Sequence, residues 1–285
     1  MAVVLLCFSL LSNSFRASVS KVIARDYLSK GEDVFLFNAI GALSASLILL
    51  VVKGFRIQVD AKVVLLSIVF ASIYLVAFLS YSESLVHGSL SFTTLITSLG
   101  MVIPMLYGIV FLSEQVTITL VIGCILMVIA LVMLSLKGGI NENKFSPKWL
   151  FWVSISFLAS GALGLFQKLF VSTVGNVDSL SFMCMTFFFL FVLSVLVLLI
   201  KRKSVAFGLK RVTLSALQGL FDASQHSLNL LLASMVPAVV LYPVLNGGAT
   251  LLSVLVALIF FKEKLDAKGV VTIVLLIASI LMISL

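Results

Sequence analysis

The amino-acid sequence predicts an all-α integral membrane protein with ten transmembrane helices, in two inverted five-helix repeats around a central cavity. Its composition is the first observation, because 62% of the residues are hydrophobic and only 11% are charged. Soluble domains are roughly half apolar and about a quarter charged. The second observation is a succession of long apolar segments with short polar connections. The third is an internal repeat.

Ten apolar segments follow one another along the chain. A helix needs about 20 apolar residues to cross a bilayer, and each segment is close to that length. We expect the first repeat at residues 1–136, a linker at 137–148 and the second repeat at 149–285. The ten predicted helices lie at residues 1–22, 34–52, 63–86, 88–112, 117–136, 149–173, 179–200, 212–234, 237–261 and 267–285.

The repeat is clearest in the last two helices of each half. Residues 111–136 align with residues 260–285 at a constant offset of 149, and seven of the 26 aligned pairs are identical, including Glu114 with Glu263. Because five is an odd number of crossings, the second half must be inverted relative to the first, as in many secondary transporters. We expect both glutamates to cap the helices that follow them, on opposite membrane faces, rather than to bind substrate.

The eighth segment carries a stripe of polar side chains near the middle of the membrane. Four of them, spaced by four, three and four residues on one helical face, are Gln218, Asp222, Gln225 and Asn229. His226 lies beside them. An ionised side chain at this depth costs at least ~2.5 kcal/mol, so the stripe cannot face lipid. We interpret these five as candidate substrate-binding residues. The alternative is a satisfied polar network that joins two helices.

The first segment carries a matching stripe. Its members, also spaced by four, three and four residues, are Ser9, Asn13, Arg16 and Ser20. We include Asn13 and Arg16 among the candidate substrate-binding residues, because a guanidinium suits a carboxylate or phosphate group of the substrate. Two alternatives stay open: Arg16 snorkels to the nearby interface, or it neutralises Asp222.

The fourth and ninth segments each contain a proline among small and polar residues. Pro104 and Pro243 remove helical hydrogen bonds, and in membranes the freed backbone groups are tolerated where they line a cavity. Tight helix packing explains the small residues equally well. The polar residues near these prolines that we count as candidate substrate-binding residues are Thr94, Ser98, Tyr242 and Asn246.

A proton is the candidate coupling ion. Asp222 and His226 lie one helical turn apart, and burial and mutual attraction act in opposite directions on their protonation, so the pair can exchange a proton in the physiological range. Glu83, near the end of the third segment, is a further candidate, although a carboxylate there is more often interfacial. The alternative to coupling is a permanent ion pair between Arg16 and Asp222 that holds the two halves in register.

The sequence resembles the EamA-type members of the drug/metabolite transporter superfamily along its whole length. The resemblance rests on Phe111 to Glu114 with the helix that follows, and on LYPVLNGGATLLSVLVALIFFKEKL from Leu241, which is also similar to small multidrug exporters. Membership implies that the first, third and fourth helices of each half line a central cavity. The membrane glutamate that small multidrug exporters carry in their first helix has no counterpart in either half, so their proton-exchange mechanism is not carried over.

The basic residues predict the orientation in the membrane. Alternate connections carry 14 Lys and Arg residues on one side and three on the other. Cytoplasmic connections carry the excess, so we expect both termini outside, opposite to the usual EamA arrangement, in the plasma or inner membrane of a prokaryote. The same connections explain the net charge of +8 without a nucleic-acid partner.

Two classes of function remain. The sequence shows no nucleotide-binding loop, metal-ligand cluster or nucleophile with a base, so we expect no cofactor, no metal and no enzymatic activity. The first class is a secondary-active transporter that moves a small polar or amphipathic metabolite by alternating access. The second is a membrane scaffold or assembly subunit whose buried polar network is purely structural. Conservative substitution of Asp222 or Arg16 abolishes flux in the first case and lowers stability in the second.

Overall fold

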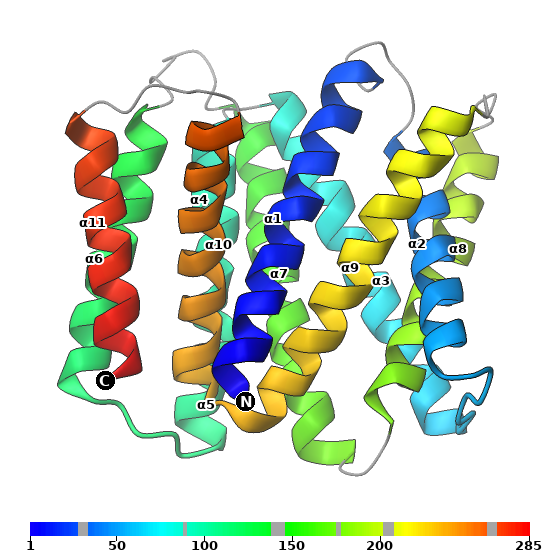
Figure 1. Ribbon diagram of the computed structural model, residues 1–285, viewed down its shortest axis with the longest axis horizontal. Helices are drawn as coiled ribbons and strands as arrows, with labels where there is room; N and C mark the ends of the chain where they lie inside the picture. Colours follow the sequence, from blue (N-terminus) through cyan, green and yellow to red (C-terminus); the bar gives the residue numbers. More distant parts are fainter. Residues whose placement is uncertain (28–33, 88–89, 138–145, 175–177, 202–207, 261–266) are drawn as a thin grey trace. The chain divides into compact units, whose positions relative to one another are not determined.

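The computed structural model describes residues 1–27, 34–87, 90–137, 146–174, 178–201, 208–260 and 267–285, and every regular element in these ranges is a helix (Figure 1). In chain order the elements are α1 (Ala2–Asp26), α2 (Val34–Val52), α3 (Ala61–His87), α4 (Leu90–Ser98), the 3₁₀ turn η2 (Leu99–Met101), α5 (Val102–Phe111), α6 (Ile118–Lys137), α7 (Pro147–Val174), α8 (Ser179–Lys201), α9 (Leu209–Met235), α10 (Ala238–Phe260) and α11 (Ala267–Ser284). The elements α4, η2 and α5 occupy one predicted crossing. The all-α prediction is confirmed, and with α4, η2 and α5 counted as one crossing the described helices match the ten predicted segments.

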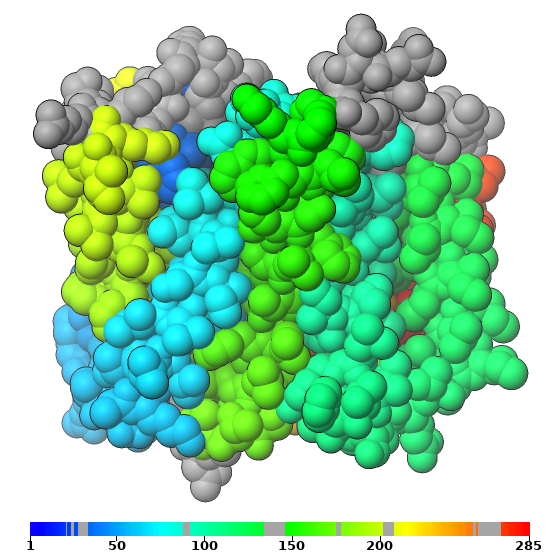
Figure 2. All heavy atoms as spheres, turned by 180° about the vertical axis from the view of Figure 1, so that it is seen from behind, coloured from blue at the N-terminus to red at the C-terminus, as the bar shows by residue number. Residues whose placement is uncertain are grey.

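The helices are long and apolar enough for a multi-pass membrane protein. Within the described residues, six helical segments reach membrane length and hydropathy: Ala2–Ser20, Val34–Val52, Ala61–His87, Phe92–Phe111, Pro147–Val174 and Ser179–Lys201. The helix α6, in green at the surface in Figure 2, exposes a row of branched apolar side chains: Ile118, Val121, Ile122, Ile125 and Ile129. A bilayer covers a continuous apolar face of this kind, whereas water does not.

The helices form two compact units, and each unit draws on both halves of the chain. The first consists of Met1–Leu75 and Thr173–Leu231, and the second of Val76–Ser172 and Leu232–Leu285. In the first unit α2 packs along α8, and in the second α6 packs along α11 and α5 against α10. The members of each pair hold the same place in the two five-helix halves that the sequence predicts. The expected division into repeats at 1–136 and 149–285, their inversion and the central cavity stay predictions.

The fourth crossing is interrupted next to Pro104, where α4 ends and η2 begins. Proline cannot donate to the carbonyl four residues earlier, so the regular α-helical hydrogen bonding gives way just before it. The helix α7 packs closely against this break, since a Cβ added at Gly161 would lie 2.7 Å from the carbonyl oxygen of Gly100. The ninth crossing differs, because Pro243 lies inside α10 without interrupting it.

Asp178 begins α8 and ties it to the end of α2. Its Oδ1 accepts the backbone N–H of Leu180 at 3.2 Å, its Oδ2 accepts the hydroxyl of Ser181 at 2.7 Å, and Lys53 forms an ion pair with it. Burial raises the pKa of this carboxyl, but the hydrogen bonds from Lys53, Ser181 and Leu180 outweigh it and hold the pKa below its usual value. The negative charge lies at the N-terminus of α8, where the helix dipole favours it.

Asp178→Ala is expected to lower the free energy of unfolding by about 0.5–2 kcal/mol at neutral pH, because α8 loses its N-terminal cap. Since the pKa of Asp178 is depressed in the folded state, this stabilisation is fully present above the unfolded pKa of about 3.9 and is lost as pH falls through the folded pKa. Thermal melts of the purified protein at neutral and acidic pH measure it. Asp178→Asn keeps the cap oxygen and isolates the contribution of Lys53. Equal melting of wild type and Asp178→Ala at neutral pH would contradict the assignment.

Candidate functional site

A buried polar cluster in the first unit joins α1, α3 and α9. We call it the arginine-aspartate cluster, and its members are Asn13, Arg16, Tyr74 and Asp222. Arg16 Nε lies 3.5 Å from Asp222 Oδ1, and Arg16 Nη2 donates to Asn13 Oδ1 at 3.0 Å. Tyr74 Oη donates to Asp222 Oδ1 at 3.4 Å. The side chain of Asp222 is 10% exposed and that of Arg16 is 32% exposed. The carboxylate is therefore buried against a guanidinium that stays partly open.

The register of α1 against α9 explains why the two polar stripes meet. Ser9 Oγ donates to Asn229 Oδ1 at 2.5 Å, and two turns further along α1 Arg16 pairs with Asp222. Residue numbers rise along α1 where they fall along α9, so the two helices run antiparallel. Because both stripes are spaced by four, three and four residues, their polar positions stay opposite one another over the whole contact.

The other two members of the α9 stripe are the glutamines Gln218 and Gln225. In the antiparallel register, Gln225 is level with Asn13, and its Oε1 is buried without a hydrogen-bond partner. Gln218 is half-buried. The stripe on α9 therefore contains both satisfied members, such as Asn229, and an amide oxygen that is available to a ligand.

His226 lies among aromatic rings on α3 and α8. Its ring centroid is 5.3 Å from that of Tyr74, 6.2 Å from that of Phe187 and 6.4 Å from that of Phe70. Tyr74 thus touches both proton-coupling candidates of α9, with its hydroxyl on Asp222 and its ring against His226. Sequence reasoning missed Tyr74, because a single tyrosine in an apolar helix gives no periodic signal.

The remaining candidates lie elsewhere. Glu83 and His87 are on the last turns of α3, 3.9 Å apart and 44% and 32% exposed, which agrees with an interfacial position for Glu83. Thr94 is exposed and shares a hydrogen bond with Tyr81 at 3.2 Å. Ser98, at the end of α4, is half-buried. All five residues belong to the second unit, whereas the arginine-aspartate cluster belongs to the first.

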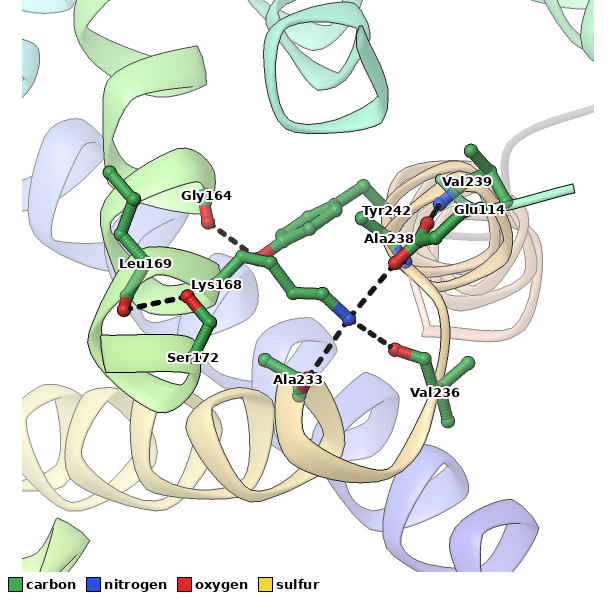
Figure 3. Close-up of polar contacts among 10 residues, drawn as sticks. All are labelled: Glu114, Gly164, Lys168, Leu169, Ser172, Ala233, Val236, Ala238, Val239 and Tyr242. Atoms are coloured by element: carbon green, nitrogen blue, oxygen red, sulfur yellow. Dashed lines mark hydrogen bonds and ion pairs between the residues drawn. The ribbon is translucent and has the colours of Figure 1, made fainter. Parts of the chain in front are cut away.

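Tyr242 and Asn246, the candidates on α10, form hydrogen bonds with protein groups. Tyr242 is buried and donates its hydroxyl to the carbonyl of Gly164 on α7 at 2.5 Å (Figure 3). Asn246 Nδ2 donates to the carbonyl of Tyr242 one turn earlier, at 2.9 Å. Their assignment to substrate stays a prediction, and the side chain of Tyr242 also ties α10 to α7.

A second charged cluster lies in the second unit, at the two-residue turn between α9 and α10 (Figure 3). We call it the helix-corner cluster. It consists of the side chains of Glu114 and Lys168 and the backbone of Ala233, Val236, Ala238 and Val239. Lys168 Nζ lies 3.2 Å from Glu114 Oε1, and their side chains are 10% and 11% exposed. This pair is more deeply buried than the pair of Arg16 with Asp222, whose arginine is 32% exposed.

Both charges of the helix-corner cluster also bind backbone groups. Lys168 Nζ donates to the carbonyls of Ala233 at 3.2 Å and Val236 at 3.0 Å. Glu114 accepts the backbone N–H of Ala238 at 2.9 Å on Oε1 and that of Val239 at 3.0 Å on Oε2 (Figure 3). Lys168 therefore contacts the end of α9, and Glu114 contacts the beginning of α10.

The end of α5 directs Glu114 toward α10. The N–H of Glu114 donates to the carbonyl of Gly108, six residues earlier, at 3.0 Å. Ser113, the residue directly before Glu114, has a left-handed φ of 53°. A left-handed residue just past the end of a helix reverses the direction of the chain, and glycine usually occupies such a position. Gly108 has no side chain in the way, since a Cβ there would meet Glu114 Oε2 at 2.4 Å.

The prediction for Glu114 was wrong about which helix the carboxylate caps. We expected it to cap α6, the helix that follows it, but its carboxylate caps α10. The start of α6 is capped instead by Thr117, whose Oγ1 accepts the N–H of Leu120 at 3.2 Å. The reason is the left-handed turn at Ser113, which directs Glu114 away from α6. Its repeat counterpart Glu263 lies outside the described residues.

The helices and their buried ionisable clusters define a multi-pass α-helical membrane protein, a class in which intramembrane charges mark functional sites. A solved structure titled "Crystal structure of protein" has a similar fold, with a TM-score of 0.76 over 99% of this chain and 95% of that chain at 13% sequence identity. No curated protein matches the sequence.

Residues 2–136 match the model of the EamA-like transporter family. This family is part of the drug/metabolite transporter superfamily, so the predicted membership is confirmed on the first half of the chain. The family consists of membrane transporters rather than enzymes. The matched half contains α1 with Arg16 and Asn13, and it also contains Glu114 of the helix-corner cluster.

Proposed function

We propose that this protein is a secondary-active transporter that moves a small polar or amphipathic metabolite by alternating access, with a binding site on the face shared by α1 and α9. The observation that carries the proposal is the pair of Arg16 with Asp222, at 3.5 Å, in which the carboxylate is buried and the guanidinium is 32% exposed. An ion pair with a purely structural role does not need one partner to be partly exposed. A guanidinium with free N–H groups can accept the carboxylate or phosphate of a ligand in a fixed geometry.

The exchange of partners at Arg16 links the substrate to a proton. When the anionic group of a substrate binds Arg16, Asp222 loses its counter-charge. A buried carboxyl without a partner is favoured in its neutral form, so Asp222 takes up a proton. Tyr74 then still hydrogen-bonds the neutral carboxyl. In this scheme Asn13 holds the guanidinium from α1, and His226, one turn beyond Asp222, lies on the route of the proton.

The helix pairing supports movement by two repeats. Within their units, α2 packs along α8, α5 against α10 and α6 along α11, and each pair joins helices that hold the same place in the two predicted halves. A two-fold relation between the halves predicts contacts of this kind. Repeats of opposite orientation give a transporter two similar conformations that open to opposite sides. We place the protein in the plasma or inner membrane of a prokaryote, with both termini outside.

A membrane scaffold is the second candidate. The short hydrogen bond of Ser9 with Asn229, 2.5 Å, favours it, because this contact joins α1 to α9 without any open polar group. On this reading the pair of Arg16 with Asp222 stays closed and fixes the register of the two helices.

A thermal-shift screen of the purified protein against small organic anions tests the proposal. A ligand that binds only the folded state raises the melting temperature, by RT ln(1 + [L]/Kd) in free energy. We expect an anionic compound to stabilise wild-type protein and not Arg16→Gln, and to be carried into vesicles that contain the wild type. His87→Gln, at the end of α3, is the matched control and should keep the ligand response. If no anion raises the melting temperature of the wild type and vesicles that contain it take up none, the proposal is wrong and the scaffold function is the correct one.

A further inference from the structure

Several backbone groups at the turn between α9 and α10 have no partner within either helix, and four of them bond side chains of the helix-corner cluster. Pro237 has no N–H, so the carbonyl of Ala233 lacks the donor that a helix supplies four residues later. The N–H of Val240 bonds the carbonyl of Pro237 at 3.2 Å, so it is not available to Val236. At the other side of the turn, the first N–H groups of α10 have no earlier carbonyl to bond.

Two side chains satisfy all four groups. Lys168 donates to both carbonyls, and Glu114 accepts from both N–H groups, those of Ala238 and Val239. Each side chain also matches the partial charge of its helix end, because the C-terminus of a helix is negative and the N-terminus is positive. Finally, the two side chains pair with one another at 3.2 Å. The same two side chains therefore bind four backbone groups of the turn and one another.

We propose that Glu114 and Lys168 are a positioning pair with a fixed polarity, which joins the end of α9 to the beginning of α10 so that the two helix ends move as one body. An ordinary ion pair works equally well when its charges are exchanged. This pair does not, because each charge is also the cap of a particular helix end. The joint sets where α10 starts, and α10 carries Tyr242 and Asn246. The inference does not depend on the proposed transport.

A second ion pair supplies the matched control. Asp26 is the last residue of α1 and Lys210 is in the first turn of α9, and their side chains are 3.1 Å apart. Here the negative charge lies at a C-terminus and the positive charge at an N-terminus, which is the unfavourable arrangement for both helix dipoles. Exchange of these two charges should therefore be neutral or stabilising.

Charge exchange with the neutral pair as reference tests the polarity. We compare three double variants. The exchanged pair combines Glu114→Lys and Lys168→Glu, and the neutral pair combines Glu114→Gln and Lys168→Gln. The control exchange combines Asp26→Lys and Lys210→Asp. The melting temperature should fall further in the exchanged pair than in the neutral pair, by about 5 °C or more, while the control exchange melts at or above wild type. An exchanged pair that melts as high as the neutral pair or higher overturns the proposal.

Amide hydrogen exchange covers the case in which the exchanged pair does not fold. In the neutral pair, the amides of Ala238 and Val239 should exchange at least about tenfold faster than in wild type, because charge-assisted hydrogen bonds are lost there. Amides in the second half of α6, which packs along α11, should be unchanged. Unchanged exchange at Ala238 and Val239, or an equal increase in α6, contradicts a joint at this turn.

Discussion

Vesicles that contain Asp222→Asn are expected to lose the pH dependence of substrate flux, while the purified variant still folds and still binds the ligand. Asparagine keeps the volume of the side chain and an oxygen for Tyr74 but has no proton to exchange. Arg16, which lies 3.5 Å from Asp222 in the wild type, then has no competing carboxylate. We therefore expect ligand affinity to be independent of pH in the range where wild-type affinity changes.

Two variants make this result specific. His226→Gln removes the second group that can exchange a proton, and Thr213→Ala changes an exposed hydroxyl on the same helix that only bonds the carbonyl of Leu209. Thr213→Ala should keep the wild-type pH profile. If Asp222→Asn and His226→Gln both transport with the wild-type profile, proton coupling through this face of α9 is wrong, even where transport itself persists.

Lys168→Met is expected to lower the free energy of unfolding by about 3–5 kcal/mol, a large part of the stability of a typical domain. The methionine leaves Glu114 buried without its counter-charge and leaves the carbonyls of Ala233 and Val236 without donors. Addition of Glu114→Gln should recover part of the loss, because the uncompensated charge is removed. Unfolding of the purified variants in denaturant, monitored by tryptophan fluorescence, gives the values.

Lys210→Met is the reference for an exposed pair. Lys210 is 69% exposed where it meets Asp26, and exposed ion pairs contribute about 1 kcal/mol or less. Lys168→Met should therefore cost several times more. Comparable losses in the two variants would mean that burial and the helix ends add nothing to the pair at the turn between α9 and α10.

The contact of α1 with α9 could be predicted from the sequence for a physical reason. Polar side chains in a membrane helix must meet one another, and two stripes with the same spacing of four, three and four residues satisfy that need along their whole length. The pair of Arg16 with Asp222 was accordingly among the expected alternatives. The fold class follows in the same way from hydropathy, since a bilayer permits few structures for long apolar segments.

The helix-corner cluster could not be predicted, because its contacts have no local signature. Glu114 precedes α6 in sequence, so a cap of α6 was the simplest expectation, and only the left-handed Ser113 turns it toward α10. Lys168 is a single charge near the end of an apolar helix. One signal was present, however: Pro237 directly after α9 means that a carbonyl near that helix end must find a donor elsewhere in the protein.

The turn between α9 and α10 also sets an order of events during synthesis. Ala238 follows Glu114 by 124 residues and Val236 follows Lys168 by 68, so the ribosome makes both charges long before their backbone partners. Asn229, the hydrogen-bond partner of Ser9, likewise follows it by 220 residues. Neither unit can be completed from the first half of the chain alone, because each contains helices of both halves. A nascent chain that stops before α9 holds Arg16, Glu114 and Lys168 in the membrane with only part of their partners. The first unit needs the chain as far as Leu231 and the second needs Leu232–Leu285, so both reach their final packing late in translation.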